Sequence, residues 1–339
     1  SCSNGSLMSV NQLQVKVEYQ TITANPVLAQ SCGLDIALVM DNSNSINDTE
    51  MSNMKSAMKG FTNALNGTPT YFSLTKFGTS ATVTQSFTNN VTTVNNAIDA
   101  VGTGGGGTNW EDGLLKANST FDPRTNKPNL VIFASDGNPT YHIGGGNGSS
   151  TSQADLDAAL NQANTIKGQG TRILALGIGN DLSVDNLKLI SGNLVNQPTL
   201  LNSDVISTDF STMASKLAEF AKQTCGGTVT VHKQVKDANG NISNGSGWTF
   251  NVGGQANKLT GVDGKTDAVK LNPGTGYSIT ETAQNGYTLE SASCTGATNN
   301  GSQSLPSGGV NGITIGNTDI VSCTFVNKRT SGTIELKKS

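Results

Sequence analysis

The sequence is poor in charge and in long apolar runs. Asp, Glu, Lys and Arg make up 13% of its 339 residues, against about a quarter in an average soluble domain, and Ser, Thr, Asn and Gly take their place. No cluster of Lys and Arg stands out, and the formal net charge is −3. These features argue against a nucleic-acid partner. No stretch approaches the ~18–20 apolar residues of a membrane helix, so we expect no membrane insertion in this segment.

Histidine is also scarce. Only His142 and His232 occur, and neither has an evident Ser or Cys partner, so we expect no enzyme. The first residues lack the pattern of a signal peptide, which suggests a mature or trimmed chain. A polar surface rich in Asn and Thr is common in secreted and cell-surface proteins.

The chain has five cysteines and no C-x-x-C pair, which argues against zinc ribbons and thioredoxin-like sites. Cys32 directly precedes the first predicted core strand, and Cys225 directly follows the last predicted helix. Cys294 and Cys323 both lie in the last third. We predict the disulfides Cys32–Cys225 and Cys294–Cys323, with Cys2 left over, and hence an oxidising, extracellular compartment. Buried free thiols are the alternative.

Residues 34–45 are central to the interpretation. Leu34–Met40 is an almost continuous apolar run, typical of a parallel strand buried on both faces. A carboxylate and two hydroxyls follow in the spacing D-x-S-x-S, and residues 48–66 have helical periodicity. The intervening loop is therefore expected at the carboxyl edge of a sheet, where open α/β sheets bind ligands.

Strand and helix patterns alternate over residues 32–225. This predicts an α/β doubly wound sheet, similar to a Rossmann fold, with helices on both faces. The tight turn at 78–80 predicts that one edge strand runs antiparallel. The expected strands are 34–40, 70–77, 81–87, 129–135, 172–178 and 199–202, and the expected helices are 48–66, 91–101, 110–120, 153–167, 184–191 and 210–224.

The helical pattern stops after Cys225. Short alternating strands separated by Asn-Gly turns predict an all-β sandwich over residues 226–330. Residues 331–339 repeat the form of residues 227–233, so they are expected to begin a further repeat or to form a terminal strand. Residues 1–31 form an N-terminal segment in which residues 12–20 alternate like a strand.

Oxygen-bearing side chains follow three of the expected strands or loops. Asp41, Ser43 and Ser45 follow the first strand, Thr108 follows four glycines at 104–107, and Asp136 follows the strand at 129–135. Two carboxylates and three hydroxyls form a hard ligand set suited to Mg²⁺, with Mn²⁺ or Ca²⁺ as alternatives. The glycines also fit G-x-G-x-x-G, but they follow no clear strand and no acidic residue stands about twenty residues on, so we expect no nucleotide site.

These motifs resemble a von Willebrand factor type A domain, with Asp41, Ser43, Ser45, Thr108 and Asp136 matching its metal-ion-dependent adhesion site (MIDAS). The resemblance implies metal binding in which the hydroxyls contact the ion and the Asp residues often act through water. It also implies a protein or extracellular-matrix partner that supplies a carboxylate. A domain that keeps these residues without metal, or with a purely structural metal, is the alternative. The loop at 141–150 could shape partner specificity or be a plain surface loop.

Three polar residues fall on inward faces of the predicted sandwich: Lys233, Glu281 and Asn327. Burying them is costly unless they satisfy one another. A desolvated Lys shifts toward its neutral, nucleophilic form, and a protonated Glu beside it could assist a self-directed Lys–Asn isopeptide bond. Lys236 is a rival, although alternation places it outward. A hydrogen-bonded cluster without the bond is the alternative.

The segments around these residues resemble prealbumin-like, Cna B-type or SpaA-like, stalk domains of bacterial surface adhesins and pilins. The resemblance implies an extracellular adhesin on a cell surface or pilus, with a metal-bearing head on a cross-linked stalk. The alternative function is a structural fibre subunit, in which residues 13–20 or 332–338 would complete the sheet of another copy of the chain.

Overall fold

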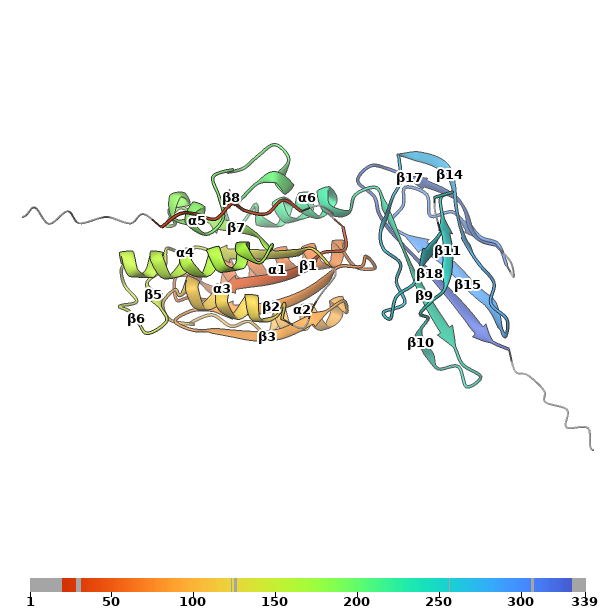
Figure 1. Cartoon of the computed structure of the whole chain (residues 1–339), viewed down its shortest axis with the longest axis horizontal. Helices are drawn as coiled ribbons and strands as arrows, with labels where there is room; N and C mark the ends of the chain where they lie inside the picture. Colours follow the sequence, from red (N-terminus) through yellow and green to blue (C-terminus); the bar gives the residue numbers. More distant parts are fainter. Residues whose placement is uncertain are drawn as a thin grey trace, which may run out of the picture.

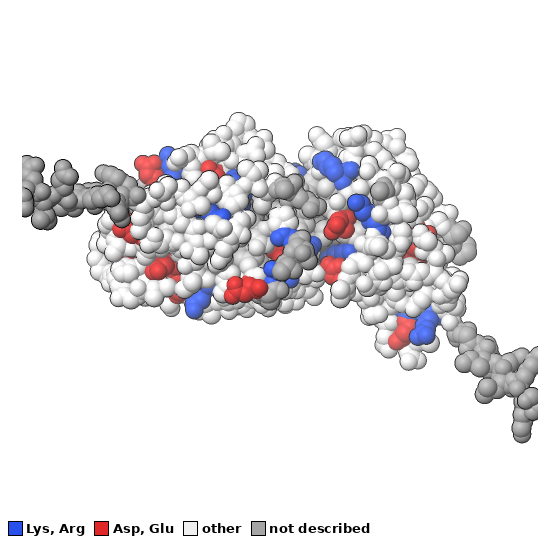
Figure 2. Space-filling view, viewed as in Figure 1, with Lys and Arg blue, Asp and Glu red and all other residues white. Residues whose placement is uncertain are grey.

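The computed structural model describes residues 20–28, 32–122, 124, 127–255, 257–305 and 308–330. Two domains lie end to end, an α/β domain and an all-β domain (Figure 1). Charged side chains are sparse on the face seen in Figure 2, in keeping with the composition. No helix in the described ranges is both long and apolar enough to cross a membrane.

The first domain contains a six-stranded sheet of order β3-β2-β1-β4-β7-β8. Only the edge strand β3 runs antiparallel to its neighbour, as the tight turn predicted. The central strand β1 is buried along its whole length, which explains its unbroken apolar run. The strands are β1 Asp35–Asp41, β2 Tyr71–Phe77, β3 Ala81–Thr88, β4 Asn129–Ser135, β7 Arg172–Ile178 and β8 Val205–Thr208.

Helices cover both faces of this sheet. Alternate residues of β1 point to opposite faces, so Leu38 packs with α1, α2 and α6, whereas Val39 packs with α3, α4 and α5. Side-chain caps begin most of these helices; Asn47, for example, caps α1 in a capping box. The helices are α1 Asp48–Ala64, α2 Val91–Asp99, α3 Trp110–Ser119, α4 Gln153–Gly168, α5 Val184–Ile190 and α6 Met213–Cys225.

One predicted strand was wrong. Residues 199–202 contain a 3₁₀-helix, η1 (Leu200–Asn202), and the edge strand is β8, a few residues further on. Leu200 is buried against the core from this turn, so its apolar character reflects packing rather than an extended backbone.

The second domain packs two sheets around one apolar core. Strands β10-β9-β18-β15 form one sheet, with β13 paired to β9, and β12-β11-β14-β17-β16 form the other. Strands β9 and β18 run parallel and side by side. The strands are β9 Thr228–Lys236, β10 Ile242–Asn244, β11 Thr249–Val252, β12 Lys258–Leu259, β13 Val269–Lys270, β14 Gly274–Glu281, β15 Tyr287–Thr295, β16 Ser302–Gln303, β17 Gly309–Ile315 and β18 Ile320–Arg329.

Two disulfides are present, with the pairing expected from cysteine placement. Cys32 and Cys225 join the two ends of the α/β domain, with 4.8 Å between their Cα atoms. Cys294 and Cys323 join β15 to β18 within the β domain. Both bridges are typical of proteins folded in an oxidising compartment.

The two domains contact each other directly. Tyr71 at the start of β2 donates a hydrogen bond of 2.8 Å to Asp263 of the β domain. Lys265 donates one of 3.2 Å to the backbone carbonyl of Thr68, and Ile320 packs against the core of the α/β domain. The two domains therefore meet over a contact surface and are not connected by a linker segment alone.

Of the N-terminal segment, residues 20–28 lie along the α/β domain. Asn25 donates hydrogen bonds of 2.8 Å to the Ile173 carbonyl and to Asp204. Residues 12–19 of the predicted strand and all of residues 331–339 lie outside the described residues.

Candidate metal site

The candidate site lies at the carboxyl edge of the α/β sheet, where β1 and β4 end side by side. The parallel register pairs Met40 of β1 with Ala134 of β4, so Asp41 and Asp136 follow at neighbouring positions on the same edge. The carboxyl ends of the parallel strands all lie at this edge of the sheet. This explains how Asp41 and Asp136, nearly a hundred positions apart in the sequence, come close together.

The glycine-rich loop docks onto the loop that follows β1. The Gly105 amide donates to the Asn42 carbonyl and the Asn44 amide donates to the Gly106 carbonyl, both at 2.8 Å. A Cβ on Gly105 would lie 2.4 Å from the Asn42 side-chain oxygen, so a side chain there would separate the two loops. The close approach carries Thr108 to the edge that holds the serines.

Four of the five predicted residues are joined by a chain of hydrogen bonds. The Ser43 amide donates to Asp41 Oδ1 at 2.8 Å, the Ser43 and Ser45 hydroxyls lie 3.1 Å apart, and the Ser45 hydroxyl donates to Asp136 Oδ1 at 2.8 Å. Adjacent ligands of an octahedral Mg²⁺ also lie about 3 Å apart, as metal–oxygen distances of 2.0–2.1 Å require. The fifth residue, Thr108, lines the same hollow as Ser43 and Ser45.

Asp41 is fully buried, and both of its oxygens accept hydrogen bonds from the protein. Besides the Ser43 amide, the Ser135 hydroxyl donates to Asp41 Oδ2 at 2.6 Å. These bonds fix the orientation of the carboxylate, although burial still raises its pKa above the ordinary value. An Asp held in this way suits the second coordination shell of an ion, where it would polarise a water or a serine hydroxyl that contacts the ion.

Asp136 completes an acidic pair. Burial, and then the charge of Asp41, raise the pKa of Asp136 to about 7. Each of the two carboxylates makes ionisation of the other less favourable. A divalent cation bound beside them would instead favour the ionised form of both, so the pair suits a cation site. Among the described residues, here as elsewhere, no group of three or more His, Cys, Asp or Glu side chains could hold a metal, so a cation at this edge would depend on the hydroxyls as well as the two carboxylates.

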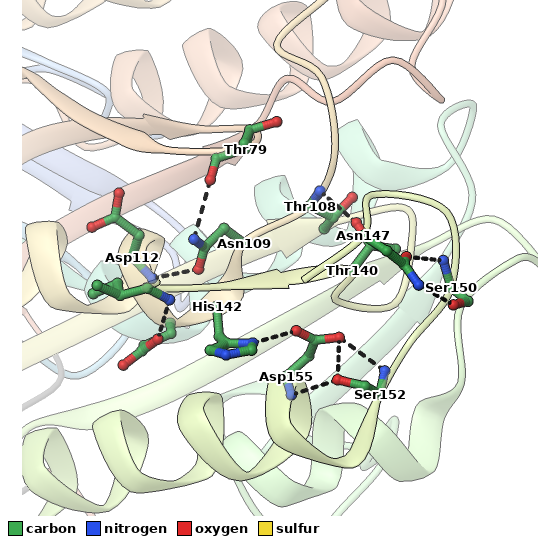
Figure 3. Close-up of polar contacts among 12 residues, drawn as sticks. Thr79, Thr108, Asn109, Asp112, Thr140, His142, Asn147, Ser150, Ser152 and Asp155 are labelled. Carbon is green, nitrogen blue, oxygen red and sulfur yellow. Dashed lines mark hydrogen bonds and ion pairs between the residues drawn. The ribbon is translucent and has the colours of Figure 1, made fainter. Parts of the chain in front are cut away.

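An open hollow of about 580 Å³ adjoins the serines and Thr108. One wall is formed by Thr140, Tyr141 and residues 147–151. These residues flank the tip of a two-stranded hairpin, β5 (Tyr141–His142) and β6 (Gly145–Gly146). The hairpin is fixed to the site, because the Thr108 amide donates to the Thr140 hydroxyl at 3.0 Å (Figure 3). The Thr108 carbonyl also accepts from the Thr140 and Tyr141 amides. None of the described residues that line the hollow is charged; most bear hydroxyls or amides.

A His–Asp pair holds the outer side of this hairpin. His142 Nδ1 lies 2.7 Å from Asp155 Oδ1, at the start of α4, and Ser152 also donates to Asp155 (Figure 3). Burial opposes ionisation of Asp155, but the hydrogen bonds from His142 and Ser152 outweigh it and lower the pKa of the carboxyl. The predicted loop at 141–150 is therefore an anchored wall of the hollow rather than a free surface loop.

Sequence reasoning missed two supporting residues. Ser135, which positions Asp41, is the last residue of the strand that precedes Asp136, and its residue type alone gave no signal. Thr140 had no signal in the sequence. Trp110, at the start of α3, is fully buried and donates to the Ser135 hydroxyl at 3.2 Å.

The second candidate cluster lies in the core of the β domain. Lys233 of β9 is fully buried, and its amine donates to Glu281 Oε2 at 2.5 Å and to the side-chain carbonyl of Asn327. The Asn327 amide donates to the other Glu281 oxygen at 2.6 Å. Burial lowers the pKa of Lys233 to about 8, with Glu281 opposing the shift. The rival Lys236 instead pairs with Glu290 at 2.7 Å on the surface.

Family models match both domains. The model of the von Willebrand factor type A domain matches residues 35–214. The chain belongs to this family. A model described as a prealbumin-like fold domain matches residues 229–329, so a prealbumin-like domain follows the A domain. No match was found among curated proteins.

Solved structures show partial similarity to the chain. Proximal thread matrix protein 1 from the mussel byssus is 24% identical, with a TM-score of 0.47, over 59% of this chain and 48% of that chain. The vWF domain of the type V pili tip protein Mfa5 from Porphyromonas gingivalis is 14% identical, with a TM-score of 0.46, over 59% and 95%. A variant of the PilB minor pilin from Streptococcus sanguinis is 14% identical, with a TM-score of 0.45, over 57% and 61%. The chain spans about half the length of the mussel protein.

An A domain followed by a prealbumin-like domain supports a surface adhesin or pilus protein. Both families are typically adhesion or structural modules rather than enzymes. With the two disulfides, the combination indicates a cell-surface or extracellular protein.

Proposed function

We propose that the chain is an adhesin whose A domain binds a carboxylate-bearing protein or matrix ligand through a divalent cation. The observation that carries the proposal is the run of oxygens from Ser43 through Ser45 to Asp136, whose spacing of about 3 Å suits an octahedral cation. Ser43, Ser45 and Thr108 would contact the ion, with Asp41 and Asp136 supplying negative charge nearby.

The ion would supply one chemical function, a positive charge with an exchangeable position for a partner's carboxylate. Because three of the proposed ligands are neutral hydroxyls, much of the charge of the ion would remain uncompensated. That leaves it able to attract an external carboxylate. Mg²⁺ fits best, since it accepts small octahedral oxygen sites; Mn²⁺ shares that geometry and serves as the experimental probe.

The binding experiment has two parts. Mn²⁺ binding, followed by electron paramagnetic resonance, should fall at least tenfold in Asp136→Ala and Thr108→Ala. It should stay unchanged in Ser149→Ala, a variant of an exposed residue that lines the same hollow. Binding to immobilised matrix proteins should then require Mg²⁺ or Mn²⁺ and should be lost when the partner's carboxyl groups are amidated. Undiminished binding in excess EDTA would refute the proposal.

For the prealbumin-like domain, we propose an isopeptide bond between Lys233 and Asn327. The neutral Lys233 amine would attack the side-chain carbonyl carbon of Asn327, and the bond from that carbon to Nδ2 would break. Glu281, which contacts both groups, would carry a proton from the amine to the departing nitrogen. One amide replaces another and one ammonia leaves, so no oxidant or cofactor is required.

A further inference from the structure

A second hollow lies at the junction of the two domains, away from the candidate metal site. Its volume is about 510 Å³, within the range of small-molecule sites. One wall is formed by the end of α1 and the start of α2, the helix at the end of the A domain that faces the second domain (Figure 1). Helix α1 begins beside the metal site and has 17 residues, so about 25 Å of helix separates the two hollows.

The other wall is the outer face of the sheet that contains β9 and β18. Side chains of a strand alternate between the two faces of its sheet. Val231 and Cys323 point into the apolar core of the second domain. The alternate residues His232, Ser322 and Thr324 point outward and line the hollow. This wall is therefore polar, and its two hydroxyls can both donate and accept hydrogen bonds.

Asparagines on both walls present amide N–H groups. On the A domain, Asn63 Oδ1 accepts a hydrogen bond of 2.8 Å from Asn95, and Asn90 Oδ1 caps α2. On the second domain, Asn244 Oδ1 lies 2.9 Å from His232 Nε2, which must be the donor because a carbonyl oxygen only accepts. These contacts engage the three amide oxygens and hold the side chains, so the NH₂ groups are the part of each amide that serves a ligand as donor.

The lining disfavours apolar and ionic ligands. Among the described residues that line the hollow, Val91 is the only one with an apolar side chain, and Phe, Tyr and Trp are absent. A hydrophobic ligand would therefore gain little by burial there. Asp263 and Lys265 are the only carboxylate and ammonium groups in that lining. Each already has a partner, since Asp263 accepts from Tyr71 at 2.8 Å and Lys265 donates to the Thr68 carbonyl at 3.2 Å. Their charges are opposite, so the hollow offers little net charge to an ion.

We propose that this hollow binds a neutral oligosaccharide that contacts both domains at once. Sugar hydroxyls both donate and accept hydrogen bonds, so one ligand satisfies the amide N–H donors of the asparagines and the hydroxyls of the sheet together. Such a ligand needs neither an apolar pocket nor an ion pair, which matches a lining of amides and hydroxyls. The site does not depend on the proposed metal-dependent binding, and it makes the joint between the domains a second recognition site.

Nuclear magnetic resonance of the full chain, labelled with ¹⁵N at asparagine and kept in excess EDTA, tests the site. The probes are three neutral disaccharides, cellobiose, maltose and N,N′-diacetylchitobiose, and one acidic sugar, glucuronic acid. At least one neutral probe should shift the side-chain amide signals of Asn63 and Asn244, and the shift should saturate. EDTA removes any contribution of a bound cation, so a failure of this experiment is distinct from a failure of metal-dependent binding.

Two variants and a matched control test whether both walls take part. Asn63 and Asn244 are exposed, so replacing either leaves the two cores intact. Asn63→Ala and Asn244→Ala should each weaken binding of the sugar at least fivefold, as measured by titration of the remaining amide signals. Asn96→Ala removes an exposed asparagine of α2 that does not line the hollow, and its affinity should equal that of the wild type.

Three results would overturn the inference. The first is the absence of any shift of the Asn63 and Asn244 amides with the neutral probes up to their solubility limits. The second is a response to glucuronic acid alone, since the hollow would then select charge. The third is wild-type affinity in Asn63→Ala or in Asn244→Ala, because a sugar that bridges the two domains must lose contacts in both variants.

Discussion

The Lys233 amine on β9 touches the Asn327 carboxamide on the neighbouring parallel strand β18. The two residues are not directly opposite each other but differ by two positions in the strand register. The register pairs Lys233 with Phe325 and Asn327 with Val235, so a diagonal contact brings the two polar groups together inside an apolar core. Glu281 reaches both from the opposite sheet. The three groups satisfy one another's hydrogen bonds, which a buried polar cluster requires.

The first prediction is that this contact matures to a covalent bond. The intact mass of the wild-type chain should be lower by one ammonia after correction for the disulfides, and Glu281→Gln should abolish the loss. Lys236→Ala is the control, because Lys236 pairs with Glu290 on the surface, and it should keep the loss. The bond should stabilise the domain by about 4.7 kcal/mol, the value for closing a loop of nearly 100 residues. A full wild-type mass would eliminate the bond.

The second prediction concerns the glycine-rich loop. Gly105→Ala places a Cβ 2.4 Å from the Asn42 side-chain oxygen and 2.8 Å from its backbone carbonyl oxygen. The loop should therefore move and carry Thr108 with it, weakening Mn²⁺ binding by at least tenfold in a calorimetric titration. Gly102→Ala is matched in chemistry but meets nothing within 4 Å, so its affinity should equal the wild type. Equal affinity in both variants would show that Thr108 does not contribute.

The third prediction is a pH dependence of metal binding. The pKa of Asp136, raised to about 7 by burial and by Asp41, means that a proton competes with the cation at and below neutral pH. Mn²⁺ affinity should rise between pH 6 and 8 and then level off. In Asp136→Asn, which is already neutral, affinity should be weak and nearly flat. A wild-type affinity independent of pH would contradict the site.

The same shift predicts how the metal-free domain responds to pH. A carboxyl whose pKa is higher in the folded than in the unfolded state stabilises the fold when protonated, and this contribution is lost as pH rises toward 7. In EDTA, the A domain should lose up to about 4 kcal/mol between pH 4 and pH 8 from Asp136. Mg²⁺ should restore stability mainly above pH 7, as thermal unfolding with and without the ion would reveal.

The fourth prediction concerns the hairpin wall. His142→Ala removes the 2.7 Å contact with Asp155 that holds the hairpin to α4. Hydrogen exchange of the amides between Tyr141 and Gly146 should become faster, while Mn²⁺ affinity should change less than twofold. His232→Ala, the other histidine variant, alters a residue of the second domain and should leave this exchange unchanged. Unaltered exchange in His142→Ala would mean that the Thr108–Thr140 contacts and the hydrogen bond from the Ile143 amide to Glu111 are sufficient to hold the wall.

Much of the A domain could be predicted from the sequence because its central strands β1, β4 and β7 are short, almost entirely buried and bounded by polar loops. Helix starts were accurate where a cap marks them, as Asn47 marks α1 and Ser152 marks α4. The strand predicted at 199–202 failed because apolar residues in a buried 3₁₀-helix have no period that distinguishes them from a strand. The helix predicted from residue 210 begins at Met213, since Asp209 accepts from the Thr212 amide and forms a turn first.

The residues that the structure brings together at the candidate sites could be picked out from the sequence, but the residues that position them could not. The oxygen-bearing side chains of the D-x-S-x-S motif, Thr108 and Asp136 could be recognised from their residue types. Lys233 could be recognised because strand alternation placed a charged side chain on the inward face. The contributions of Ser135 and Thr140 depend on which loops face each other, and no local pattern encodes that. The His142–Asp155 pair is likewise visible only after β5 packs on α4.

The parallel pairing of β9 and β18 has a consequence for assembly. Because both strands run the same way, the chain enters this domain beside the A domain at Thr228 and leaves it at the opposite end, at Arg329. Each copy of such a module would advance the chain by the length of a nine-residue strand, about 30 Å, without folding it back. Repeats joined in this way would form a straight spacer, and the reach of the head from its anchor would grow in proportion to their number.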